Sequence, residues 1–160
     1  MSAKQSDAVP NFGLRRARPE DYGFAESLYL ETGEPLFVEL GQWNEEEVVT
    51  RFKEKFKPEE VQIISVDGVD AGWLQTSEAE KEIHLIQIHL RQDFRSAGIG
   101  SRIIRNLMRD AGNKNKAVSL FVFSNNPARQ LYKRLGFEIV SENAEKLLMR
   151  WNLNQSGPED

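Results

Sequence analysis

Residues 95–101 read Arg-Ser-Ala-Gly-Ile-Gly-Ser and join two strongly patterned stretches. The stretch before them, 83–90, is apolar except for three polar residues, which predicts a strand covered on both faces. The stretch after them, 98–111, repeats apolar residues at helical spacing, which predicts an amphipathic helix. Glycines let a backbone approach a ligand closely, and the first amides of a helix have no partner inside it. The turn therefore has the features of an anion site.

Local charge agrees with an anionic ligand. Residues 94–109 contain no acid and four arginines, so the field there is positive although the chain is acidic. A dinucleotide fingerprint needs a third glycine where Ile103 stands, and a P-loop needs Gly-Lys followed by Ser or Thr, so neither nucleotide motif fits. A Gly-x-Gly turn by itself is also compatible with a turn that binds nothing.

Working outward, strand signals alternate with helix signals and predict a mixed α/β layer. Helices are expected at 19–32, 44–56, 98–111 and 127–135, and strands at 14–18, 61–66, 69–76, 83–90, 117–123, 137–140 and 147–153. Asp-Gly at 67–68 predicts a two-residue hairpin turn. The unit 83–123 predicts a right-handed crossover between parallel strands, and the strands before it are expected to form an antiparallel meander.

Composition limits the function classes. With 160 residues, we expect a single domain over 13–153 between flexible ends at 1–12 and 154–160. Twenty-one basic against twenty-five acidic residues give a net charge of −4, which argues against nucleic acid and membrane as partners. The absence of cysteine excludes disulfides and a covalent thiol intermediate. We see no signal peptide or membrane segment, so the expected location is the cytoplasm.

A second motif follows the turn by about 30 residues. Residues 125–137 read Asn-Asn-Pro-Ala-Arg-Gln-Leu-Tyr-Lys-Arg-Leu-Gly-Phe. Together with the turn, they resemble the GNAT superfamily of N-acetyltransferases. That family's coenzyme-A loop reads Gln/Arg-x-x-Gly-x-Gly/Ala, and its later helix carries Asn-x-x-Ala-x-x-Leu-Tyr and then Leu-Gly-Phe. The chain departs from the family at Ser96, where glycine is usual.

The resemblance implies a GNAT-like α/β (α+β) fold, a mixed sheet of about six to seven strands with about four helices. It also implies acetyl-CoA as cosubstrate and no metal. The diphosphate would bind the backbone amides of 95–101, and the pantetheine arm would pair with 88–90 like an added strand. The Leu90 amide would face the thioester carbonyl, Asn125 would contact the pantetheine, and Tyr132 would protonate the leaving thiolate. The cofactor-binding residues implied are Ile88, His89, Leu90, Arg95, Ser96, Ala97, Gly98, Ile99, Gly100, Ser101, Asn125 and Tyr132.

A base is needed because an amine with a pKa of about 10 is mostly protonated at neutral pH. His84 lies eleven residues before Arg95, where several members of the family place a Glu or His base. Glu82 has the same strand parity and could act through water. His89 has the opposite parity, so we expect it to face away from the reacting centre together with Gln87, unless a bulge distorts the strand. Each of these residues also has a purely structural interpretation.

The acceptor side is less clear. Residues 31–47 contain six glutamates and no Lys or Arg, which favours a cationic amine, although helix caps and a solvated loop explain the same acids. Phe37, Trp43 and Trp73 either line an apolar wall or belong to the core. The expected partners are acetyl-CoA and an amine acceptor, in a monomer or homodimer. The alternatives are a non-catalytic acyl-CoA-binding module and a phosphate-binding turn in a nucleotide enzyme.

Overall fold

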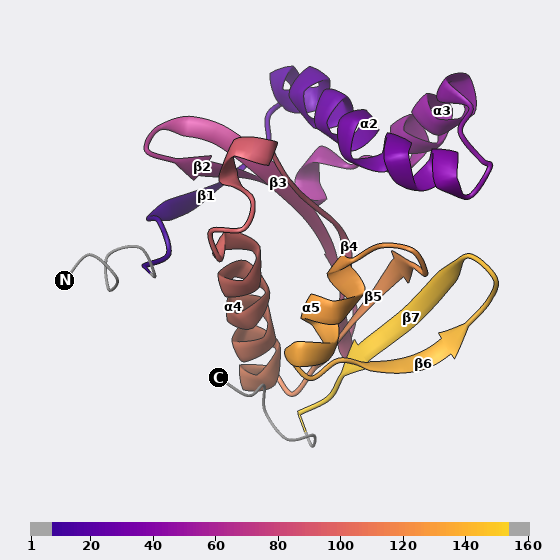
Figure 1. The fold of residues 1–160 in the computed structure, drawn as a ribbon. Helices are drawn as coiled ribbons and strands as arrows, with labels where there is room; N and C mark the ends of the chain where they lie inside the picture. The colour runs from indigo at the N-terminus through magenta and orange to yellow at the C-terminus, as the bar shows by residue number, and fades with distance from the viewer. Residues whose placement is uncertain (1–7, 154–160) are drawn as a thin grey trace.

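Seven strands form one sheet in the order β1-β2-β3-β4-β5-β7-β6 (Figure 1). The structure is a computed structural model and describes residues 8–153. The strands are β1 (Phe12–Arg16), β2 (Val61–Val66), β3 (Val69–Glu78), β4 (Glu82–Leu90), β5 (Ala117–Phe123), β6 (Glu138–Glu142) and β7 (Lys146–Trp151). The helices are α2 (Tyr22–Glu39), α3 (Glu45–Lys55), α4 (Ile99–Asn113) and α5 (Ala128–Arg134), with short 3-10 turns η1 (Pro19–Asp21), η2 (Pro58–Glu60) and η3 (Gln92–Phe94).

Helices cover both faces of the sheet. In Figure 1, α4 and α5 lie against one face, and α2 and α3 lie against the other near the top. The core is divided accordingly: one buried cluster joins the sheet to α4 and α5, and a second, which includes the fully buried Trp73, joins it to α2 and α3. The expected α/β class, the number of strands and the four main helices are confirmed.

Strand β4 lies at the middle of the sheet, as its apolar sequence predicts. It pairs antiparallel with β3 and parallel with β5, so the predicted crossover through α4 is present. The Asp67-Gly68 turn is also confirmed, with positive φ at both residues (50° and 80°). That backbone matches the twist of a two-residue hairpin.

Helix α2 is longer than predicted. The sequence suggested an end near residue 32, before Gly33, yet the helix continues through Gly33 and Pro35 to Glu39. Phe37 is buried in the α2–α3 core, and its ring lies where a Cβ on Gly33 would approach to 3.1 Å. Burial of Phe37 therefore outweighs the helix-breaking tendency of Pro35. Leu40 is the C-cap of the helix, and Gly41 follows with φ +71°.

Other boundaries differ by a few residues. Asn44 caps α3 as predicted, because its Oδ1 accepts a hydrogen bond from the Glu47 amide at 3.1 Å. Val9 and Phe12 pack against the core, so an ordered segment precedes the expected start at residue 13. The remainder of the predicted flexible ends, 1–7 and 154–160, lies outside the described residues. Within 8–153, no helix has both the length and the apolar character needed to cross a membrane.

Candidate active site

Strands β4 and β5 pair only over their first halves. The register runs from Glu82 opposite Ala117 to Leu85 opposite Leu120, whereas β4 continues to Leu90 and β5 to Phe123. Figure 1 shows the sheet dividing there, with β1–β4 continuing to the upper left and β5, β7 and β6 turning to the right. The second half of β4 therefore has β3 on one side and no paired strand on the other.

A bulge in β4 marks the point of separation. Thr76 of β3 lies opposite Leu85 and Gln75 lies opposite Gln87, so Ile86 is an extra residue on β4. A bulge bends its strand and locally disrupts pairing. The parting of β4 from β5 therefore begins where the sequence inserts this one residue.

The bulge also overturns the parity argument for the two histidines. His89 packs its ring against Tyr29 and Trp73, within the α2–α3 core. His84 packs against Phe121, on the β5 face that carries Phe123 into the same core. The prediction that His84 and His89 face opposite sides is therefore wrong. The extra residue Ile86 shifts the alternation by one, so both side chains project from the face of the sheet that α2 and α3 cover.

The predicted anion turn has the expected backbone. Ser96 has φ +64° and Gly98 has φ +89°, and α4 begins directly afterwards without a side-chain cap. Within the part of the chain that the structure describes, the amides of 96–101 have no hydrogen-bond partner. Arg95 is an exception to the predicted set, because its amide donates to the Gln92 carbonyl at 3.2 Å. The turn thus offers unpaired N–H groups at the positive end of a 15-residue helix.

Ser96 adopts a backbone conformation that favours glycine. Its φ of +64° lies in the left-handed region, which costs a residue with a side chain about 1 kcal/mol. The amide is still present, so the departure from glycine strains the turn without removing a donor.

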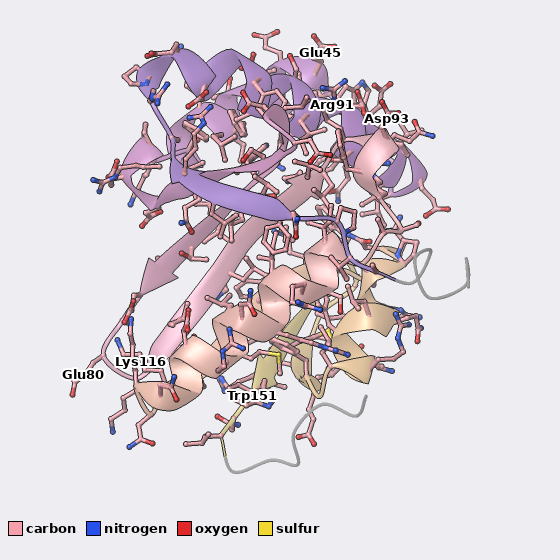
Figure 2. All side chains as sticks on the ribbon, turned by 90° about the vertical axis from the view of Figure 1, so that its left-hand side faces the viewer. Glu45, Glu80, Arg91, Asp93, Lys116 and Trp151 are labelled. Carbon is pink, nitrogen blue, oxygen red and sulfur yellow. The ribbon has the colours of Figure 1, made fainter. Side chains whose placement is uncertain are left out.

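Arg95 ties the turn to its surroundings. Its Nε donates to the Leu90 carbonyl at 2.8 Å, and its Nη2 lies 3.8 Å from the Glu31 carboxylate of α2. Both charged groups of this ion pair are exposed, so it contributes little energy. The hydrogen bond to Leu90 fixes the start of the turn beside the end of β4, which Arg91 and Asp93 mark in Figure 2.

The Leu90 amide points away from β3. The next amide, that of Arg91, points toward β3, because it donates to the carbonyl of Ala71 in that strand at 2.8 Å. Successive N–H groups of a strand point in opposite directions, so the Leu90 amide is directed to the side where β5 has separated. The same alternation directs the Ile88 amide there. These are the donors that a ligand between the strands would meet.

Asn125 and Tyr132 lie beyond the end of β5. The Asn125 Nδ2 group donates to Glu39 Oε1 and, at 3.4 Å, to the Leu36 carbonyl of α2. Its Oδ1 is buried and has no partner among the described residues. Tyr132 belongs to the core cluster against which Ile88 and Leu90 pack, and burial raises the pKa of its phenol to about 12. Tyr132 thus shares a core cluster with Ile88 and Leu90, whereas Asn125 is held by α2 and keeps a buried carbonyl oxygen without a partner.

His84 and Glu82 are joined by a residue that the sequence interpretation missed. The hydroxyl of Ser119 on β5 donates to Glu82 Oε2 at 2.5 Å, and the same Oγ lies 2.9 Å from His84 Nδ1. Arg150 on β7 donates from Nε to Glu82 Oε1 at 3.2 Å. The available signal was Ser119 itself, the one hydroxyl in the otherwise apolar stretch 117–123. Desolvation lowers the pKa of His84, and the charge of Glu82 partly opposes this.

His89 has a different environment. Its Nδ1 lies 2.7 Å from the Thr32 hydroxyl and its Nε2 lies 2.6 Å from Gln87 Oε1. Burial, helped by the charge of Arg95, lowers its pKa to about 3. Both ring nitrogens are engaged and the imidazole is neutral at any physiological pH.

The predicted acceptor region holds fewer free acids than its sequence suggests. Glu31 approaches Arg95, Glu39 accepts from Asn125, and the run 45–47 forms the first turn of α3. Trp73 and Phe37 are core residues, whereas Trp43 is half-buried. Within the described part of the chain, no group of three or more His, Asp or Glu side chains is arranged to hold a metal ion.

Comparison with known proteins identifies the family. Residues 18–137 match the Acetyltransferase (GNAT) family. The chain belongs to this family. It is therefore an acetyl-CoA-dependent acyltransferase, and the resemblance inferred from its two motifs is confirmed. No curated protein matches the chain in sequence.

Solved structures share the fold of this GNAT chain at low sequence identity. A PaiA N-acetyltransferase from Thermoplasma acidophilum, in complex with coenzyme A, has a TM-score of 0.72 at 15% identity and covers 89% of this chain and 99% of its own. Ard1 from Thermoplasma volcanium has a TM-score of 0.65 at 18% identity, with 89% and 97% covered. Arabidopsis thaliana Naa50, in complex with the bisubstrate analogue CoA-Ac-MVNAL, has a TM-score of 0.62 at 16% identity, with 88% and 98% covered.

Proposed function

We propose that this GNAT chain transfers the acetyl group of acetyl-CoA to a primary amine by direct attack in a ternary complex. One observation carries the proposal: β4 and β5 separate after Leu85 and Leu120, next to a turn whose amides at 96–101 have no partner. The separated strands provide a place for an extended arm, and the turn provides donors for a diphosphate at the end of that arm.

Acetyl-CoA fits the groups that the structure leaves unpaired. The diphosphate binds the amides of 96–101, and the pantetheine arm extends along Ile88–Leu90 as an added strand, which agrees with the outward direction of the Ile88 and Leu90 amides. The buried Asn125 Oδ1 accepts from an amide of the arm, which satisfies a group that is costly to leave without a partner. His89, which the resemblance included among the binding residues, offers the arm neither ring nor amide: its ring is enclosed in the α2–α3 core, and its amide, between those of Ile88 and Leu90, is directed toward β3.

The Leu90 amide stabilises the oxyanion that develops as the amine attacks the thioester. A backbone donor held by a sheet needs no rearrangement during the reaction, which is the physical advantage of this arrangement. Arg95 supports it, because its hydrogen bond to the Leu90 carbonyl fixes the orientation of the strand end.

Tyr132 donates a hydrogen bond to the sulfur as it leaves. With a pKa of about 12, the phenol is protonated throughout the working range, but complete transfer to a thiolate with a pKa of about 8.5 in water is unfavourable. Burial raises the pKa of a thiolate as well, which reduces this difference. We therefore expect Tyr132→Phe to lower kcat about tenfold while leaving the dissociation constant of CoA unchanged.

His84 is the base that the geometry favours. Its lowered pKa keeps the imidazole neutral at pH 7, and only its Nδ1 has a partner among the residues of 8–153. It accepts the amine proton through Nε2 by way of a chain of water molecules, because Leu90, whose amide faces the thioester carbonyl, lies six residues further along β4. His89 is excluded because both its nitrogens are engaged and its pKa is about 3. Glu82 is occupied by Ser119 and Arg150 and acts through His84.

The acceptor is a primary amine whose further groups need not be positively charged. Most of the six glutamates have other roles. Cations are also present beside Phe123: Lys146 lies over its ring, and burial together with the charges of Lys55 and Arg51 lowers the pKa of the Lys146 amine. The bisubstrate complex of Naa50, a protein with the same fold, joins CoA to a peptide. Peptide N-termini therefore belong in the set of acceptors to be tested beside small amines and protein lysines. Cytoplasmic location and a monomeric or homodimeric state stay predictions from sequence.

The test is release of CoA thiol from acetyl-CoA with a panel of neutral, anionic and cationic amines and short peptides. The proposal predicts that at least one acceptor accelerates release, that an acetylated product forms in equal amount, and that Tyr132→Phe slows it. Tight binding of CoA with no acceleration by any acceptor would instead indicate a non-catalytic acyl-CoA-binding module.

A further inference from the structure

Four polar side chains form a continuous row across the paired half of the sheet. They run from Arg150 on β7 through Glu82 on β4 and Ser119 on β5 to His84 on β4, with successive contacts of 3.2, 2.5 and 2.9 Å. Ser119 is fully buried, and the other three are half-buried. The family comparison assigns no role to this row.

Strand register explains why these residues meet. His84 lies opposite Ser119 in the parallel pair, and Ser119 lies opposite Arg150 in the antiparallel pair with β7. Glu82 precedes His84 by two residues, so both side chains project from the same face of β4. All four side chains therefore lie on one face, the face from which Phe121 also projects.

The direction of each hydrogen bond follows from the inventory of donors. The Glu82 carboxylate has no hydrogen to give, so Arg150 and Ser119 both donate to it. Ser119 has a single hydroxyl hydrogen, which this bond uses. Its oxygen must then accept from His84, which requires the hydrogen on Nδ1.

We infer that Ser119 and Glu82 are positioning residues that hold His84 as its Nδ1–H tautomer, with the lone pair of Nε2 available to take the proton of the acceptor amine. A free imidazole exchanges between two tautomers, and the partner of one nitrogen decides which atom carries the hydrogen. This inference rests on the proposed function for its purpose, but the tautomer itself is a property of the resting protein.

The electrostatic surroundings of His84 are simple. Glu82 is the charged group that acts on its titration, Arg150 is held at the far side of Glu82, and Phe121 of β5 contributes an apolar edge. From β3, the residue opposite is Ser77, which carries no charge. A change at Glu82 should therefore alter the pKa of His84 in one direction, downward, because the carboxylate favours the imidazolium.

The first experiment is nitrogen NMR of the imidazoles in the whole protein at neutral pH, with His84 assigned by comparison with His84→Gln. We expect His84 as the Nδ1–H tautomer in the wild type and as a mixture of tautomers in Ser119→Ala. Ser77→Ala is the matched control, since it removes a hydroxyl on the opposite side of His84 and should leave the spectrum unchanged. A wild-type His84 with its hydrogen on Nε2, or an unaltered tautomer in Ser119→Ala, would overturn the inference.

The second experiment is the pH profile of kcat/KM with acetyl-CoA and an active amine. Ser119→Ala should lower kcat about tenfold with no change in CoA binding. Glu82→Gln should move the acidic limb to lower pH, a shift that loss of a merely structural contact would not produce. If the acidic limb of the Glu82→Gln profile stayed at the wild-type pH, the proposed effect of Glu82 on His84 would be refuted, even if that variant were less stable. The Nδ1–H tautomer together with an unchanged rate in His84→Gln would show that the proposed base is wrong while the hydrogen-bonded row exists.

Discussion

His84 lies in the half of β4 that pairs with β5, and His89 lies in the half that does not. Both rings point to the α2–α3 face, yet one is half-buried with a single engaged nitrogen and the other is enclosed with both nitrogens engaged. The residue nearer to the parted strands is therefore the poorer base. Residue type and proximity alone would favour His89, and the number of unengaged nitrogens favours His84.

The largest expected difference between the two halves is in turnover. We expect His84→Gln to lower kcat about 10²- to 10³-fold with the dissociation constant of CoA unchanged, because general base catalysis contributes about that much. His89→Gln should lower stability and change kcat per folded molecule less than about tenfold. Steady-state kinetics with calorimetric CoA titrations measures both variants, and equal losses of turnover would remove the distinction.

Gly72 of β3 packs closely against the backbone of the second half of β4, and its substitution tests that contact. A Cβ at residue 72 would lie 2.1 Å from the His89 carbonyl oxygen and 3.0 Å from the Leu90 Cα, so β3 and β4 can approach this closely only at glycine. We expect Gly72→Ala to lower the free energy of unfolding by about 3 kcal/mol. The control is Gly23→Ala in α2, where a Cβ meets nothing within 4 Å and which should stabilise slightly. Chemical denaturation of both variants decides, and equal stabilities would contradict the close approach.

Acid sensitivity separates the histidines by their pKa values. In the unfolded chain His89 takes up a proton below about pH 6.5, whereas in the folded chain its pKa is about 3, so stability falls as pH drops from 6.5 toward 3. At pH 4 the loss from His89 amounts to about 3 kcal/mol relative to pH 7. Asp21, whose pKa the Arg15 guanidinium lowers, loses its contribution only at more acidic pH.

Denaturation curves from pH 7 to pH 4 measure this loss. His89→Gln should remove most of the slope, and His84→Gln should remove less because that ring is half exposed. A wild-type slope retained in His89→Gln would show that the buried ring is not its source.

Gly100 gives the smallest effect and the cleanest one. A Cβ there meets only Leu90 Cδ1, at an ordinary 3.9 Å, so the fold accepts a side chain. Gly100→Leu should weaken CoA binding about tenfold, or about 1.4 kcal/mol, by blocking the approach of the diphosphate. Gly100→Ala is the control, with stability higher by up to about 1 kcal/mol and little change in affinity. Calorimetry should show this contrast, and an undiminished affinity in Gly100→Leu would place the diphosphate elsewhere.

Much of this arrangement could be predicted from local sequence. The turn 95–101, the Asp67-Gly68 hairpin, the Asn44 cap and the crossover through α4 follow from residue types at fixed offsets, and the structure has all of them. The continuation of α2 through Pro35 could not be predicted in this way, because it depends on burial of Phe37 against residues distant in sequence.

Two features of the site required the three-dimensional pairing. The bulge at Ile86 carries no glycine or other local signal, yet it reverses the face of every later residue in β4. Ser119 meets His84 only because the parallel register sets them opposite each other. The sequence contained the parts of the row, whereas their contact depends on the alignment of three strands.

The most direct test of the account is a titration of the isotopically labelled protein with acetyl-CoA, followed by the backbone amide resonances. Binding of the diphosphate and the arm as proposed should shift the amides of 96–101 and those of Ile88 and Leu90, while Arg95, whose amide is already engaged, and the distant strand β6 should change least. Shifts confined to other parts of the sheet, with 96–101 unaffected, would contradict the claim that these backbone donors hold acetyl-CoA.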